Sequence, residues 1–292
     1  METKLFFFRK PLPFLLLFLF FAGCGLFAAG RSGKEDAMLT EKAAEQIQAL
    51  GIGPDYAPDA ELFRTDPEFM SNLYNFAYGE VLSRTDIQIP ERDRHLAVLA
   101  AVLGTQGTGE FETVLRAALN GGISPVEAKE VIYQSAAYLG FAKVRPFLSA
   151  ANGVMEDMGF RLPLEPQGTV TQENRREEGN RVQVEIFGGG MRESWLSGPE
   201  ERAAVNSFLA SNCFGDYYTR GGLSLKDREL VTFCFLIAQG GCEPQAVSHA
   251  AGNFAMGNDR EYLFRVVSNL TPYIGYPRTL NAMGCIETAA KN

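Results

Sequence analysis

A thiol and an imidazole near the end of the chain have the residue types and the spacing for nucleophilic or acid–base chemistry. Cys242 and His249 are seven residues apart, which is two turns of an α-helix. Pro244 suits a first helical turn, so Cys242 is predicted at a helix start with both side chains on one face. A helix N-terminus stabilises a thiolate, and a nearby imidazole can accept its proton. A free cysteine is more commonly a small buried apolar residue, and this alternative stays open.

The element before this pair is predicted to be a helix that carries a carboxylate towards it. Ser224 is followed three residues later by Asp227, the pattern of a capping box at a helix start. An apolar run over 230–238 follows, and the double glycine at 240–241 ends the helix. Glu229 lies just before that run. It is therefore a candidate to orient the thiol and imidazole or to relay their proton.

Composition and charge exclude several kinds of protein. The chain has 292 residues, of which 46% are hydrophobic, enough for a sizeable core. The net charge of −8 argues against nucleic-acid binding. The chain has 2 histidines, one in each half, and no Cys-x-x-Cys, so neither a metal site nor a cofactor is predicted. The glycines at 188–190 follow a predicted helix and no strand, so they do not form a phosphate-binding loop.

Residues 1–30 have the organisation of an export signal. Basic residues in the first ten positions precede an apolar run at 11–22, which is short for a stable membrane span of roughly 20 residues. Phe-Ala-Gly-Cys at 21–24 resembles a bacterial lipobox, in which Cys24 would be lipidated after cleavage. Simple cleavage near Ala28 and an uncleaved anchor are the alternatives. We expect export to the bacterial periplasm or cell envelope, with membrane contact only through this segment.

The remaining cysteines all lie in the C-terminal half. An oxidising compartment permits disulfides, but three complete pairings of four cysteines are possible and the sequence selects none. Cys234 is predicted to be buried within an apolar helix. The four residues are Cys213, Cys234, Cys242 and Cys285.

Beyond the export segment, the chain is predicted to be all-α, in two tandem helical-bundle domains. No segment has the alternating pattern of a strand. The first domain is placed at 38–159, a Pro-rich linker at 160–171 and the second domain at 172–290. The motif at 138–142 recurs at 273–277, an offset of about 135 residues that other motifs share. A duplicated pair packs most simply as a pseudo-symmetric dimer.

The two copies differ where chemistry is expected. His95, Gly107 and Val114 stand where the second copy has its carboxylate, thiol and imidazole. The first copy is therefore expected to be structural or to contribute residues to a shared site. Within it, residues 54–64 are expected to form a loop with a short turn, and Ser124 before a proline predicts a helix start.

The repeated pattern resembles the carboxymuconolactone decarboxylase family, which includes the alkylhydroperoxidase D-like proteins. The similar features are Arg-Glu-Leu-Val at 228–231, an apolar helix, a glycine break, a helix with a histidine, and Tyr-x-Gly before an aromatic residue. The resemblance covers roughly residues 60–158 and 172–288. It implies a fold of the alkylhydroperoxidase D-like type that assembles into trimers or hexamers, so a homo-oligomer is expected.

The resemblance implies two different chemistries. Peroxidase members carry a Glu, a Cys-x-x-Cys and a His, and Glu229, Cys242 and His249 match the Glu, the first Cys and the His. Gln245 replaces the second Cys, and the interval from the Glu to the Cys is one residue longer than in the family, which puts the position of the Glu in doubt. Decarboxylase members lack the Cys but keep the His.

A decarboxylase would also need positive groups to hold a carboxylated lactone. Arg228, Arg278 and Arg260 are candidates for binding such a substrate. Each of them could equally be a surface residue in a salt bridge.

Three functions follow from this reading. The first is a thiol-dependent peroxidase, with Cys242 as nucleophile, His249 as base, Glu229 orienting them, a peroxide as substrate and an external thiol as reductant. The second is decarboxylation or lactone processing, with His249 as general acid and base. The third is a non-catalytic oligomeric binding module.

Overall fold

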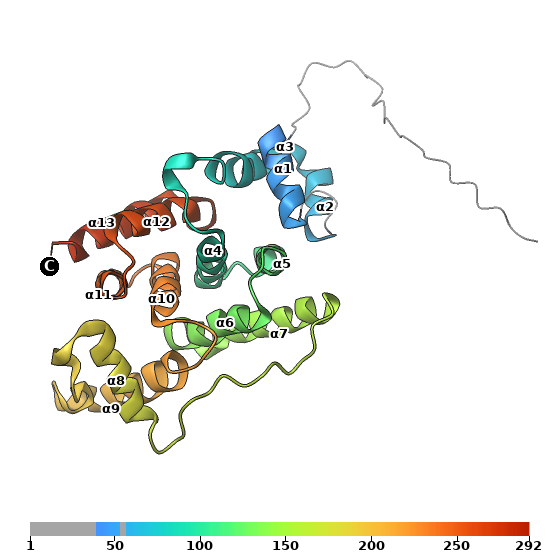
Figure 1. The fold of residues 1–292 in the computed structure, drawn as a ribbon. Helices are drawn as coiled ribbons and strands as arrows, with labels where there is room; N and C mark the ends of the chain where they lie inside the picture. Colours follow the sequence, from blue (N-terminus) through green and yellow to red (C-terminus); the bar gives the residue numbers. More distant parts are fainter. Residues whose placement is uncertain (1–38, 53–56, 292) are drawn as a thin grey trace, which may run out of the picture. The chain divides into compact units, whose positions relative to one another are not determined.

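The protein is helical throughout the part of the chain that its structure, a computed structural model, describes: residues 39–52 and 57–291 (Figure 1). No strand occurs among these residues. The α-helices are α1 (Glu41–Leu50), α2 (Ala57–Thr65), α3 (Pro67–Tyr74), α4 (Glu91–Thr105), α5 (Thr108–Asn120), α6 (Pro125–Leu139), α7 (Phe141–Asp157), α8 (Arg175–Phe187), α9 (Ala203–Phe208), α10 (Leu225–Gln239), α11 (Glu243–Ala255), α12 (Arg260–Ile274) and α13 (Tyr276–Ala289). The predicted export signal and Cys24 lie outside the described residues.

Each repeat contains one π-helix, which precedes α4 in the first repeat and α10 in the second. They are η1 (Asn75–Val81) and η6 (Leu209–Tyr218). In the second repeat the π-helix crosses α8 so closely that a Cβ on Gly179 or Gly215 would overlap with the backbone of the other helix. These glycines allow η6 to lie against α8, and η6 thereby carries aromatic side chains towards the core of the second repeat.

The predicted helix starts are confirmed. Ser124 accepts a hydrogen bond from the backbone N–H of Glu127, whose side chain accepts one in return. Ser224 and Asp227 form the same capping box at the start of α10. Each box satisfies two backbone donors that a helix start otherwise leaves unpaired.

The expectation of a loop over residues 54–64 is wrong for residues 57–64, which lie in helix α2. Residues 54–56 lie outside the described residues. The ring of Phe63 packs edge-on against Tyr74 of α3, with ring centroids 4.9 Å apart. This tertiary contact stabilises a short helix whose own sequence pattern is weak.

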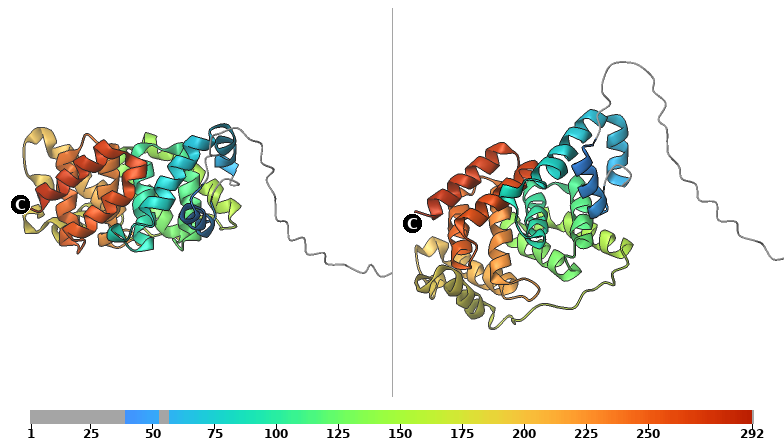
Figure 2. Two further views of the ribbon diagram at one scale, coloured as in Figure 1. Left: turned by 90° about the horizontal axis from the view of Figure 1, so that it is seen from above. Right: turned by 45° about the horizontal axis from the view of Figure 1, so that its top comes forward.

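The two repeats correspond helix by helix. Helices α4 to α7 of the first repeat match α10 to α13 of the second, each shifted by about 135 residues. At the centre, α4 packs against α10, while α6 packs on α10 and α12 packs on α4 (Figures 1 and 2). Each repeat therefore places one of its helices against the central helix of the other.

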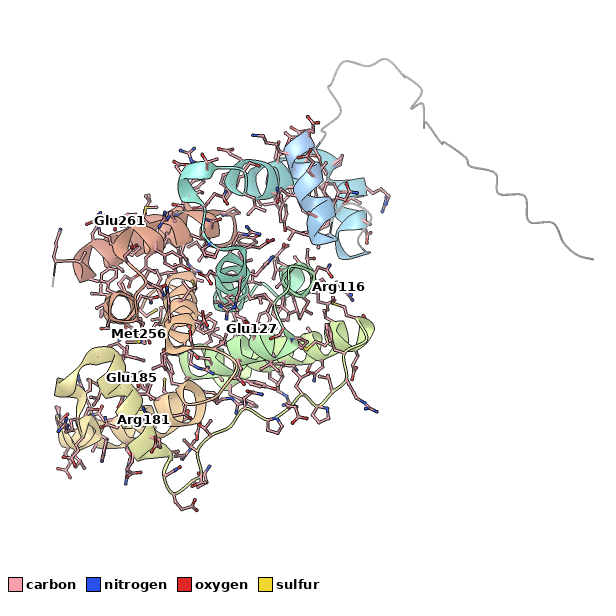
Figure 3. The ribbon with its side chains drawn as sticks, in the orientation of Figure 1. Arg116, Glu127, Arg181, Glu185, Met256 and Glu261 are labelled. Carbon is pink, nitrogen blue, oxygen red and sulfur yellow. The ribbon has the colours of Figure 1, made fainter. Side chains whose placement is uncertain are left out.

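One hydrophobic core runs through both repeats. Its buried side chains come from α4 to α7 and from α10 to α13, and they fill the spaces between these helices in Figure 3. The central helices are buried on nearly all sides, which agrees with their uninterrupted apolar sequences. None of the described helices is long and apolar enough to cross a membrane.

An ionic cluster joins the two central helices at one end. Arg92 of α4 donates to Glu127 at 2.8 Å and, with two nitrogens, to Asp227 of α10 at 2.9 and 3.0 Å. A forked contact of this kind fixes geometry as well as contributing energy. The two capping boxes are thus held together by one arginine.

Candidate active site

A buried carboxylate and imidazole face each other between α10 and α11. Nδ1 of His249 lies 2.9 Å from Oε2 of Glu229. Glu229 is fully buried and His249 is 8% exposed. Asn253 donates to the backbone carbonyls of both residues at 2.8 Å, which ties the two helices together at this level. The extra residue near positions 240–241 therefore does not separate the carboxylate from the imidazole.

A chain of hydroxyl groups supports the carboxylate. Tyr218 of η6 donates to Oε1 of Glu229 at 2.8 Å and lies 2.8 Å from the hydroxyl of Thr232. The hydroxyl of Tyr138, which comes from α6 of the first repeat, lies 2.9 Å from that of Tyr218. Burial raises the pKa of both tyrosines well above the ordinary value, so they are neutral hydrogen-bond donors. The site is thus built from both repeats.

Two aromatic rings enclose the imidazole. Tyr138 and Phe187 of α8 each meet the ring of His249 edge-on, with centroids 5.5 and 5.6 Å away. These contacts and the carboxylate fix the ring plane. With Nδ1 bound by the carboxylate, Nε2 is the nitrogen that can exchange a proton with a substrate.

The predicted thiol lies at the helix start, as expected, but it is not hydrogen-bonded to the imidazole. Cys242 is the N-cap residue of α11. Among the described residues, its Sγ donates to the carbonyl of Leu236 at 3.3 Å and accepts from Gln239 at 3.9 Å. Burial raises the pKa of the Cys242 thiol, and the charge of Glu243 adds to this. This direction is opposite to the one expected from a helix N-terminus.

Comparison with known proteins identifies the family to which this chain belongs. The sequence pattern of the Carboxymuconolactone decarboxylase family matches residues 67–153 and 203–288, together more than half of the chain. The chain belongs to the carboxymuconolactone decarboxylase family. It is also similar to the 4-carboxymuconolactone decarboxylase of Acinetobacter baylyi, with 32% identity over 93 residues, which are 32% of this chain and 68% of that protein.

Two candidate arginines of this family member have different surroundings. Arg278 of α13 donates to the carbonyl of Ala238 and lies against Gly240, beside a small cavity that Cys285 also lines. Its charge acts to lower the pKa of Cys242 but does not outweigh burial. Arg278 is therefore close to the glycine break that precedes the thiol.

Arg228 holds the two repeats together. It is fully buried, and its guanidinium donates to Gln134 at 2.7 Å and to Glu130 at 3.1 Å, both on α6 of the first repeat. It also donates to the backbone carbonyls of Arg220 and Gly221. These partners orient the guanidinium towards the repeat interface. The third candidate, Arg260, is paired with Glu261 and Glu287.

A second sulfur lies near the thiol. Sγ of Cys285, on α13, is 3.8 Å from the carbonyl of Glu243, the residue that follows Cys242. Burial raises the pKa of the Cys285 thiol, and the charges of Glu243 and Cys242 add to this. In contrast, Cys234 is fully buried in α10 and burial strongly raises its pKa.

The residues that sequence reasoning missed are the ones that hold the imidazole and carboxylate in place. Tyr138 and Tyr218 were not recognised as site residues, although Tyr138 belongs to the motif that recurs at 273–277. A Cβ on Gly252 of α11 would overlap with Oε2 of Glu229, so this glycine makes room for the carboxylate. No cluster of three or more His, Cys, Asp or Glu in residues 39–52 and 57–291 could hold a metal ion.

Proposed function

We propose that the second repeat is an acid–base site that removes CO2 from a carboxylated lactone or a similar conjugated acid, with His249 delivering the proton. The buried contact between Glu229 and His249 is the observation that carries this proposal. It supplies an oriented imidazole with one free nitrogen and requires no thiolate. Family membership and the name of the similar Acinetobacter protein agree with this chemistry.

The proposed reaction needs one electron sink and one proton. The bond between the substrate's carboxylate carbon and its neighbour breaks, and its electron pair moves into the conjugated carbonyl group as CO2 leaves. Protonated Nε2 of His249 then gives its proton to the carbon chain, and the imidazole recovers a proton from water. The net change is loss of CO2 and gain of one proton at carbon.

The surrounding residues have defined parts in this proposal. Glu229 orients the imidazole of His249 through Nδ1 and offsets the positive charge of the protonated ring, and Tyr218 holds the carboxylate in turn. Arg278 is the candidate to hold the substrate carboxylate. One of its nitrogens donates to the carbonyl of Ala238, and a guanidinium has five N–H donors in all.

The test is decarboxylation of 4-carboxymuconolactone by the full chain in D2O. Turnover should place deuterium on the product carbon. His249→Gln should lower kcat by about 10²- to 10⁴-fold, the range for loss of a general acid. Ser248→Ala is the matched control, because Ser248 is the exposed neighbour on the same helix. Equal rates in wild type and His249→Gln would disprove the proposal.

A thiol peroxidase is a second candidate, favoured by the position of Cys285 next to the start of α11. The Cys242 thiolate would attack the O–O bond of a peroxide to give a sulfenic acid and an alcohol or water. The Cys285 thiolate would then attack the Cys242 sulfur and release hydroxide, and an external dithiol would reduce the disulfide formed. The raised pKa of Cys242 makes this chemistry slow at neutral pH.

Peroxide consumption with an added dithiol separates the two candidates. If the protein is a thiol peroxidase, Cys242→Ser abolishes peroxide consumption. Mass spectrometry of the wild type after peroxide treatment then finds the peptides of Cys242 and Cys285 joined by a disulfide. If decarboxylation is the function, Cys242→Ser keeps most of the turnover of the carboxylated lactone, while His249→Gln loses it.

A further inference from the structure

Two buried asparagines lie next to the carboxylate and imidazole of the second repeat. Asn253 is fully buried in α11, one turn after His249, and Asn258 is 2% exposed in the loop that follows this helix. Asn253 donates to the backbone carbonyls of Glu229 and His249, each at 2.8 Å. Asn258 donates to the side-chain oxygen of Asn253 at 2.8 Å and to the carbonyl of Lys226 at 3.3 Å. All the side-chain N–H groups of the two residues thus bond to α10 or α11.

The groups around Asn253 determine the orientation of its amide. A backbone carbonyl only accepts hydrogen bonds, so the side-chain atom that faces the carbonyls of Glu229 and His249 is the nitrogen. The oxygen then faces the side-chain nitrogen of Asn258. The hydrogen bonds therefore run in one direction, from the loop after α11 to the backbone of both site residues.

The turn at the end of α11 brings the two amides together. Gly257 has a positive φ of 88°, and the backbone N–H of Asn258 bonds to the carbonyl of Asn253 at 2.9 Å. The N–H of Gly257 bonds to the carbonyl of Phe254. These are the bonds of a Schellman motif, in which the two side chains brought together are commonly apolar. In the second repeat both are amides.

The first repeat forms the same turn without amides. Gly122 has a φ of 91°, and the backbone N–H of Ile123 bonds to the carbonyl of Ala118 at 3.0 Å. The side chains of Ala118 and Ile123 are buried in the hydrophobic core. Helix α5 packs against α4 as α11 packs against α10. Neither the turn nor this helix packing therefore requires buried asparagines.

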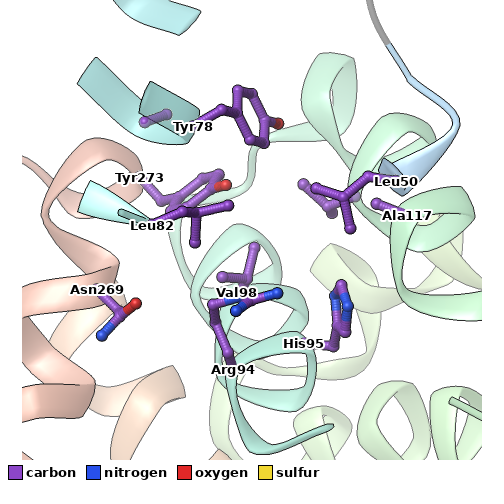
Figure 4. A pocket seen from close by; sticks show the side chains of 11 residues that line it. Leu50, Tyr78, Leu82, Arg94, His95, Val98, Ala117, Asn269 and Tyr273 are labelled. Atoms are coloured by element: carbon purple, nitrogen blue, oxygen red, sulfur yellow. The ribbon is translucent and has the colours of Figure 1, made fainter. Parts of the chain in front are cut away.

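The first repeat also lacks the two groups that the asparagines hold. His95 and Val114 stand at the positions of Glu229 and His249, and both line one small pocket. Figure 4 shows His95 in this pocket together with Val98 of the same helix. Nε2 of His95 is buried and has no hydrogen-bond partner among the described residues. Of the two repeats, the one with the asparagines is thus the one whose carboxylate and imidazole face each other.

We propose that Asn253 and Asn258 are positioning residues that set the distance between the carboxylate of Glu229 and the imidazole of His249, for the acid–base function on which this inference rests. Apolar contacts between helices tolerate small shifts, but a hydrogen bond weakens steeply when its distance or angle changes. An amide that bonds to one carbonyl on each helix therefore favours a single spacing of α10 and α11. Buried polar groups whose hydrogen bonds are all satisfied rigidify a core in this way.

The test replaces both asparagines by the residues of the first repeat, in the double variant Asn253→Ala/Asn258→Ile. The chain should fold, because alanine and isoleucine form the same turn in the first repeat. We expect kcat for decarboxylation of 4-carboxymuconolactone to fall by about 10²-fold, the cost of a misplacement of about 1 Å. KM should change little, because neither asparagine contacts the substrate. In NMR of histidine-labelled full chain, the Nδ1–H signal of His249, which the contact with Glu229 shifts downfield, should move upfield or be lost by exchange.

Asn269 of α12 provides the matched control. It is 6% exposed, and it likewise donates to the carbonyl four residues earlier, Arg265 at 2.9 Å, and to a carbonyl on another element, Ile87 at 2.8 Å. Asn269→Ala should therefore lose stability in urea unfolding, yet leave kcat and the His249 signal unchanged. If Asn269→Ala changes kcat and the signal as much as the double variant does, the two asparagines have only a structural part and the proposal is wrong.

Asn258→Ile alone gives a second measurement if the double variant does not fold. It leaves Asn253 in place but removes the donor that fixes its oxygen, so kcat and the His249 signal should change in the same direction and by less. An unchanged signal in the folded variants would overturn the proposal. The signal does not depend on turnover. If the wild type turns over no lactone, the proposed function fails, and the comparison of signals still decides whether the asparagines position the imidazole.

Discussion

The hydroxyl of Tyr138 in the first repeat lies 2.9 Å from the hydroxyl of Tyr218 in the second. Tyr218 in turn donates to Glu229, the carboxylate that holds His249. The first copy has no thiol or imidazole at the positions that match Cys242 and His249, yet it supplies one end of the hydrogen-bond chain that orients the imidazole of the second. The duplication therefore made a shared site in which one half positions the groups of the other.

Replacing Tyr138 by phenylalanine should show what the hydrogen bonds of its hydroxyl contribute, because the ring contact with His249 is kept. Tyr138→Phe loses the contacts to Tyr218 and Cys213 but keeps the ring against His249. We expect the free energy of unfolding to fall by about 1 kcal/mol, the net value of a buried hydrogen bond. Decarboxylation should fall less than in His249→Gln. Urea unfolding and kcat of both variants measure this, and equal losses of kcat would assign the Tyr138 hydroxyl a direct part in catalysis.

A methyl group at Gly252 should disturb the carboxylate of Glu229 without replacing any titratable residue. Alanine within a helix normally adds stability, by roughly 0.5–1 kcal/mol relative to glycine. At Gly252 the added Cβ overlaps with Oε2 of Glu229, so Gly252→Ala should lose both stability and turnover.

The matched control for this prediction lies in α13. A Cβ on Gly284 would meet no heavy atom within 4 Å, so Gly284→Ala should be neutral or stabilising and should leave turnover unchanged. Thermal unfolding and kcat of the two alanine variants give the comparison. If Gly252→Ala behaves like Gly284→Ala, the position of the carboxylate does not depend on this glycine.

Removing the buried arginine should destabilise the association of the two repeats. Arg228→Met leaves Glu130 and Gln134 without their guanidinium partner in the core. Breaking a buried pair by removing one partner typically costs ~3–5 kcal/mol, and the lower end is expected because Arg220 also pairs with Glu130. Urea unfolding measures the loss. Arg260→Met on the surface is the control, and a loss of equal size in the two variants would disprove the argument.

Local signals in the sequence correctly predicted where the two helices that carry Glu229 and His249 begin. The capping box at Ser224 placed the helix that bears Glu229, and Pro244 placed the start of α11 at Cys242. Both signals act over three or four residues and are largely independent of the rest of the fold. The same local geometry and the resemblance made Glu229 a candidate to orient His249, but the longer interval between Glu229 and Cys242 left the position of the carboxylate open.

The remaining features depend on contacts between distant parts of the chain. Arg228 was a candidate for substrate binding, but its partners Gln134 and Glu130 are 94 and 98 residues away and no local pattern announces them. The pKa of Cys242 was expected to fall at a helix start. Burial raises it instead, and burial is set by how α10, α11 and α13 pack together.

The predicted lipid anchor can be tested outside the described residues. If the lipobox-like sequence at 21–24 is functional, cells that produce the chain should incorporate labelled palmitate into it and retain it in the membrane fraction. Cys24→Ser should abolish both. Cys285→Ser is the control for labelling of other thiols, and label that persists in Cys24→Ser would disprove lipidation at this residue.

The buried histidine of the first repeat should make stability depend on pH. Burial, with a contribution from Arg94, lowers the pKa of His95 to about 4 from an ordinary value of 6.5. Below pH 6.5 the unfolded chain therefore binds a proton that the folded chain does not, and stability falls as the pH drops towards 4. The full loss is about 3 kcal/mol, at 1.36 kcal/mol for each pH unit. His95→Gln should flatten this slope in urea unfolding between about pH 4.5 and 7.5. His249 is present in both proteins, so its contribution cancels, and an unchanged slope would show that His95 is not held neutral.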